Sequence, residues 1–121
     1  MSQEQALRAE ISSLLQQDLD ELNALLGQSD PDAGDTLHSF ESARRWGEQV
    51  ISQLSDKLHT SICRDWRYCE RRKSKAFDDD VTLATAVAGT IVAGIGTHPV
   101  AIIATILVKR GLDAFCDCAG D

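Results

Sequence analysis

Apolar residues recur every three or four positions in the first half of the chain, which is the period of an amphipathic α-helix. The polar stretch QSDPDAGD that ends at Asp35 separates two such stripes and predicts a loop. The second stripe is roughly 50 Å long at 1.5 Å per helical residue. We therefore expect amphipathic helices at about 3–27 and 36–72. The apolar positions of the first are Leu7, Ile11, Leu14, Leu15, Leu19, Leu22, Leu25 and Leu26.

Residues 81–108 contain no Asp, Glu, Lys or Arg. As a single helix this segment would be about 42 Å long, which exceeds the roughly 30 Å hydrocarbon core of a bilayer. It is interrupted by GIGTHP at 94–99, where the glycines suit a helix end and Pro99 suits the first turn of a new helix. The pattern therefore predicts a helical hairpin with arms at about 80–95 and 98–115, the first of them beginning at the acidic run Asp78 to Asp80.

These four elements predict one all-α domain over residues 1–121, a small four-helix bundle-like fold with two amphipathic helices and a C-terminal apolar hairpin. Each helix of a bundle normally keeps a solvent face, but both hairpin arms are apolar on nearly all sides. We therefore expect part of their surface to be buried against a second copy or a protein partner. Small side chains that allow close helix approach mark the expected interface, and they are Ala84, Ala88, Gly89, Ala93 and Gly94. The leading hypothesis is a non-catalytic interaction or oligomerisation module.

The chain has a formal net charge of −7, and this acidity argues against a general nucleic-acid binder. Residues 64–75 are a local exception, because cations predominate there and two aromatic residues, Trp66 and Tyr68, lie among them. Such an arrangement can bind phosphates and stack bases, but an acidic protein surface or anionic lipid headgroups are the better match. The predicted basic patch comprises Arg64, Arg67, Arg71, Arg72, Lys73 and Lys75.

The N-terminus has no basic region followed by an apolar run, so it does not resemble a signal peptide and a cytoplasmic location is expected. The four cysteines should then stay reduced. A zinc site is one hypothesis for these thiols, because His59 and Cys63 are one helical turn apart and could meet Cys116 and Cys118 if the chain end folds back. In the simpler alternative Cys69 packs as a small apolar residue and the sequence CDCAGD frays. We otherwise expect no cofactor.

Catalysis is not expected, since the sequence offers no Gly-rich phosphate loop and no residue that would orient a Cys–His pair. The alternative function, from another class, is a membrane-active protein whose apolar hairpin 81–108 inserts into or perturbs a bilayer. In outline the arrangement is similar to pore-forming bundles of the colicin type, in which amphipathic helices hide an apolar hairpin. That similarity is one of architecture and involves no shared motif. It makes membrane association a second possibility beside a cytoplasmic location.

Overall fold

The computed structural model describes residues 3–29, 39–95 and 99–118, and within these ranges the chain is all-α and contains no strand. The predicted fold class is therefore confirmed. The predicted helix starts at about 36 and 98 lie outside the described residues, as do residues 96–98 of the GIGTHP segment that predicted the turn. The helical elements are α1 (Gln3–Leu14), α2 (Leu19–Ser29), α3 (Phe40–His59), the π-helix η2 (Thr60–Asp65), α4 (Tyr68–Arg71), the 3-10 helix η3 (Lys75–Phe77), α5 (Asp80–Ile95), α6 (Val100–Arg110) and α7 (Leu112–Phe115).

The predicted helix at 3–27 is wrong in one respect, because it is two helices. The chain leaves the helical path after Leu14, and α2 starts with a reciprocal capping box between Asp18 and Glu21. The Glu21 amide donates to Asp18 Oδ1 at 2.8 Å, and the Asp18 amide donates to Glu21 Oε1 at 3.1 Å. This pair satisfies two amides that a helix start leaves without a partner, so α2 can begin at a new angle.

The predicted helices at 36–72 and 98–115 are also broken. After α3 the backbone widens into η2, whose end is marked by the Trp66 amide donating to the Ser61 carbonyl at 3.0 Å. Arg67 then adopts the left-handed conformation, with φ 58° and ψ 55°, before α4. Gly111, with φ 101°, separates α6 from α7, which is a conformation that glycine adopts at little cost. Helix α5, in contrast, has the predicted bounds.

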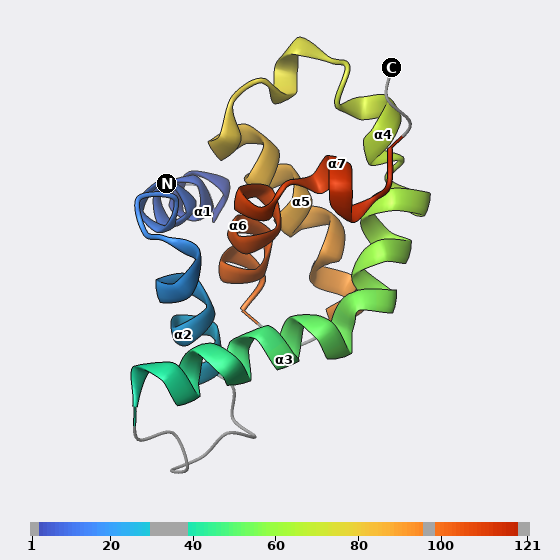
Figure 1. The fold of residues 1–121 in the computed structure, drawn as a ribbon. Helices are drawn as coiled ribbons and strands as arrows, with labels where there is room; N and C mark the ends of the chain where they lie inside the picture. Colours follow the sequence, from blue (N-terminus) through green and yellow to red (C-terminus); the bar gives the residue numbers. More distant parts are fainter. Residues whose placement is uncertain (1–2, 30–38, 96–98, 119–121) are drawn as a thin grey trace.

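The two arms of the hairpin form the centre of the molecule (Figure 1). Helix α1 packs on α5 and α6, α2 packs on α3 and α6, and α3 with η2 packs on α5. Residues 101–107 of α6 are all buried. Because the break after Leu14 produces two separate covering helices, the chain buries most of the hairpin itself. On α5 one large apolar side chain stays exposed, Val92 at 49%. None of the helices in the described ranges is both long and apolar enough to span a membrane.

Helices α2 and α3 approach each other at two glycines. A methyl group at Gly27 would overlap the backbone carbonyl of Ala43, and one at Gly47 would overlap the carbonyl of Asn23. The two helices therefore pack backbone against backbone, which a larger residue at either position would prevent.

Candidate functional site

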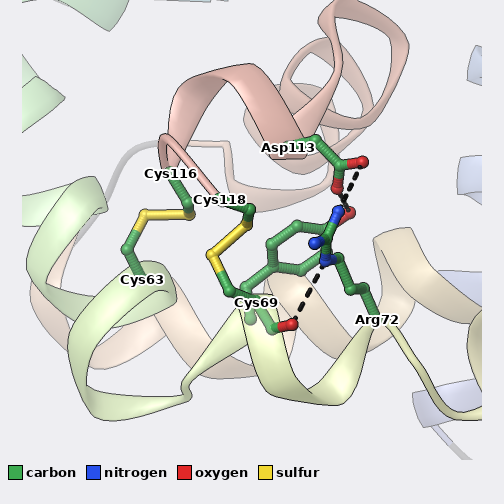
Figure 2. Close-up of a disulfide and its surroundings, with 7 residues drawn as sticks. Cys63, Cys69, Arg72, Asp113, Cys116 and Cys118 are labelled. Atoms are coloured by element: carbon green, nitrogen blue, oxygen red, sulfur yellow. Dashed lines mark hydrogen bonds and ion pairs between the residues drawn. A yellow bond between two sulfur atoms is a disulfide. The ribbon is translucent and has the colours of Figure 1, made fainter. Parts of the chain in front are cut away.

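Two disulfides join the end of the long helical arm to the C-terminal segment (Figure 2). Cys63, in η2, bonds to Cys116 with a Cα–Cα distance of 5.3 Å, and Cys69, in α4, bonds to Cys118 with a Cα–Cα distance of 5.4 Å. All four cysteines of the chain are used in this way. The C-terminal C-x-C sequence is thus attached at two points to one short stretch of backbone.

The expectation that the cysteines stay reduced is therefore wrong for this structure. On a regular helix Cys63 and Cys69 would point about 120° apart. The left-handed Arg67 lies between them and reorients the chain, so both side chains reach the residues that follow α7. At the other end, the break at Gly111 turns α7 and the residues after it back toward η2 and α4.

The four residues of the zinc hypothesis do not form a cluster of available ligands. Cys63 and Cys116 are bonded to each other, Cys118 is bonded to Cys69, and the ring of His59 packs 5.7 Å from that of Phe115. A disulfide sulfur is not the thiolate that zinc binds. Within the described ranges no three His, Cys, Asp or Glu side chains are arranged to hold a metal ion. A zinc site here would require the reduced chain and stays a prediction.

The stretch from Cys63 to the end of η3 carries a dense positive charge, and we define these residues, 63–77, as the basic segment. It holds six cations against two carboxylates, Asp65 and Glu70. The side chain of Arg72 is half-buried, and the other five predicted patch residues are exposed. Figure 1 shows the segment at one end of the molecule, leading from η2 through α4 to η3. All six predicted patch residues therefore lie on one covalently anchored stretch.

Trp66 organises this segment from within. Its ring lies edge-on to Phe77 at 5.4 Å and is stacked with Tyr68 at 6.4 Å, both measured between ring centroids. The guanidinium of Arg71 lies 5.4 Å from the centroid of the Trp66 ring, and its Nε donates to the Trp66 carbonyl at 2.6 Å. The Trp66 ring thus packs against two aromatic side chains, and the Arg71 guanidinium makes a cation–π contact with it.

Besides the two disulfides, Asp113 of α7 makes a third, noncovalent link between the basic segment and the C-terminal segment. Its Oδ1 accepts from the Tyr68 hydroxyl at 2.7 Å, and its Oδ2 accepts from Arg72 Nη1 at 3.0 Å. Arg72 Nε also donates to the carbonyl of Cys69 at 3.2 Å, as Figure 2 shows. Sequence reasoning missed Asp113, because no local pattern indicates that it meets residues more than forty positions away.

Tyr68 should ionise only at unusually high pH. Its burial, followed by the hydrogen bond to Asp113 and the negative charge of that carboxylate, raises the pKa of the Tyr68 hydroxyl well above its ordinary value, while Arg72 opposes this shift. Tyr68 is the single tyrosine of the chain. Because folding favours the neutral phenol, its contribution to stability is complete below about pH 10. That contribution is lost as pH rises through the raised pKa.

An ultraviolet absorbance titration tests this expectation without interference from another tyrosine. In the folded protein we expect little tyrosinate at about pH 10, where a free phenol is half ionised. In strong denaturant the same transition should return to about pH 10. Circular dichroism at each pH identifies the range in which the protein stays folded. Half ionisation near the ordinary value while the helices persist would contradict the burial of the Tyr68 hydroxyl together with its pairing to Asp113.

The residues of the predicted small-residue interface are not all accessible. Ala84 and Ala88 are 0% and 1% exposed and pack inside the chain's own core, so they cannot form an external surface in this structure. Gly89, Ala93 and Gly94 are exposed. The five residues were expected to act together, but α5 rotates two of them toward the core and leaves three outside.

Comparisons with known proteins identify no relative for this architecture. No protein-family model matches the chain, and neither a curated protein nor a solved structure shows significant similarity to it. The basic segment and the two disulfides are therefore the features from which a function is inferred.

Proposed function

We propose that the protein is a non-catalytic, disulfide-braced helical module that binds an acidic protein surface through the basic segment. The observation that carries this proposal is the distribution of charge. The basic segment holds six of the twelve Lys and Arg residues but only two of the nineteen Asp and Glu residues. Charges separated in this way steer an oppositely charged partner to one orientation.

An acidic protein fits this surface better than a nucleic acid does. Outside the basic segment the chain has six Lys and Arg residues against seventeen Asp and Glu residues, so this larger part of the molecule disfavours a phosphate backbone. Base stacking would need an available aromatic face, whereas the Trp66 ring already contacts Phe77, Tyr68 and Arg71. A partner whose carboxylates meet the exposed cations requires neither a long phosphate track nor a stacking platform.

The disulfides support a binding function by holding the cations in place before a partner arrives. Cys63 and Cys69 lie on either side of Arg67, and both are bonded to the C-terminal segment. A surface ordered in advance loses less conformational entropy on binding. Disulfides persist in oxidising compartments, so we propose that the module works in such a compartment, in place of the cytoplasmic location suggested by the N-terminus.

Fluorescence anisotropy with a labelled peptide rich in Glu tests the proposal. Replacing Arg64, Arg67 and Lys75 by Glu should weaken binding at least about tenfold, since each exposed charge pair contributes up to about 1 kcal/mol. Binding should also weaken as salt is added, because the charges are solvent-exposed.

A matched control separates the position of the cations from the net charge. Replacing Arg45, Lys57 and Arg110 by Glu changes the charge by the same amount at exposed positions outside the basic segment. This variant should bind the peptide nearly as well as the parent protein does. The proposal is wrong if both triple variants bind equally, or if duplex DNA or anionic vesicles bind and the peptide does not.

A second candidate function, self-association, is favoured by the exposed face of α5. Val92 is 49% exposed and lies beside exposed Gly89 and Ala93. Residues 81–95 contain no charged side chain, so this face can meet its own copy without the repulsion expected elsewhere on an acidic chain. Replacing Gly89 by Leu should then break association and leave helicity intact, as measured by light scattering. A parent protein that elutes at its monomer mass of 13.2 kDa would contradict this candidate.

A further inference from the structure

A hollow of about 340 Å³ adjoins the basic segment, which contributes Arg72 and Lys73 to its lining. It is lined by Tyr68, Arg72, Lys73, Phe77, Leu83 and Asp113. These residues come from α4, the turn after it, η3, α5 and α7, so the hollow exists only because the tertiary fold brings five parts of the chain together. Its volume is at the low end for small-molecule pockets and suits a single large side chain.

We infer that this hollow receives a large apolar side chain of the acidic partner, so that the partner's recognition segment consists of one such residue flanked by carboxylates. The inference rests on the proposed function. Phe77 and Leu83 supply the apolar part of a lining that is otherwise polar, and Phe77 is the more exposed of the two. An apolar anchor that enters a pocket surrounded by polar groups is the arrangement that concentrates binding energy in protein interfaces.

The polar lining of the hollow favours a negatively charged segment around that anchor. Both oxygens of Asp113 are already occupied, one by the Tyr68 hydroxyl and the other by Arg72. Lys73, in contrast, is exposed and makes no ion pair within the described part of the chain. The hollow therefore presents an unneutralised cation next to an apolar wall, and a carboxylate beside the anchor would complement it.

Two labelled Glu-rich peptides that differ only at one central residue, Phe or Ala, test the inference. The Phe peptide should bind at least about tenfold more tightly, because its aromatic ring is removed from water when it enters the hollow. Replacing Phe77 by Ala should remove most of this preference. Phe40→Ala is the matched control, since Phe40 is 53% exposed and lies far along the chain, at the start of α3. The control should keep the preference.

Amide chemical shifts provide a measurement that does not depend on how well Phe77→Ala folds. In the parent protein, the Phe peptide should shift the Lys73 and Leu83 amides more than the Ala peptide does. If the two peptides bind with equal affinity and the Arg64, Arg67 and Lys75 reversals still weaken that binding, the anchor is overturned and the proposed function stands. If neither peptide binds the parent protein, both the anchor and the proposed function are wrong.

Discussion

A chain in which all four cysteines are replaced by alanine should lose more stability than the two single disulfide removals together predict. The reason is that the two bonds close overlapping loops. Cys63–Cys116 joins residues 53 positions apart, and closing a loop of that size stabilises a protein by about 4 kcal/mol in the chain-entropy model. Once this bond exists, Cys69–Cys118 closes only a further ring of about eight residues, which is worth about 2.5 kcal/mol.

Either disulfide can serve as the bond that closes the long loop. Removing one of them should therefore cost about 2.5 kcal/mol, whereas removing both should cost about 6–7 kcal/mol. Domains of this kind are stable by only about 5–15 kcal/mol, so the chain without disulfides should be close to unfolding at room temperature.

Urea unfolding followed by circular dichroism measures the three losses. The parent protein in excess dithiothreitol is the control, because it lacks both bonds but keeps the sulfur atoms that fill the core near Cys116. If the quadruple variant is unfolded without urea, the free energy of unfolding of the parent sets the lower limit of its loss. If the loss of stability of the quadruple variant equals the sum of the two single losses, the two disulfides restrict the unfolded chain independently, and the prediction is wrong.

Replacing Gly47 by Ala should destabilise the protein by about 3 kcal/mol, although alanine is normally the better helix former. The new methyl group would overlap the carbonyl of Asn23, and backbone atoms cannot move aside as a flexible side chain can. Helices α2 and α3 must then separate, and the apolar contacts between them weaken. The free energy of unfolding in urea is the appropriate measurement.

Gly89→Ala is the matched control for this substitution. Gly89 also lies within a helix, but a methyl group there would meet nothing within 4 Å. The control should therefore gain about 1 kcal/mol from the better helix propensity of alanine. If both variants change stability in the same direction and by similar amounts, the close crossing of α2 and α3 does not limit the size of residue 47.

The helix breaks differ in how far the sequence could reveal them. The capping pair Asp18 and Glu21 and the single Gly111 are local signals, but the apolar period continues through both and favours unbroken helices. The π-helix η2 and the left-handed Arg67 have no comparable local signal. Their backbone conformations are less favourable than a regular helix, and they occur where two disulfides and the packing of α7 hold the chain.

The candidate site was only partly predictable for a similar reason. The cations of the basic segment are neighbours in sequence, so their grouping could be recognised before the structure was known. The disulfide pairing, the role of Asp113 and the hollow against Leu83 depend on residues that are distant in sequence. The sequence also favoured a single accessible interface made of the five small residues of α5. In the structure the orientation of that helix places two of them, Ala84 and Ala88, inside the core.

By itself, the sequence determined the helical class of the protein, the apolar hairpin with its first arm at 80–95, and the location of the positive charge. These properties follow from interactions within a few residues, namely helical periodicity, helix-end chemistry and charge. Only the tertiary structure decided which cysteines pair, where the long helices break, how much of the hairpin is covered and which side chains surround the hollow. Such contacts depend on how helices cross in three dimensions, and residues far apart in the chain carry no local signal of that geometry.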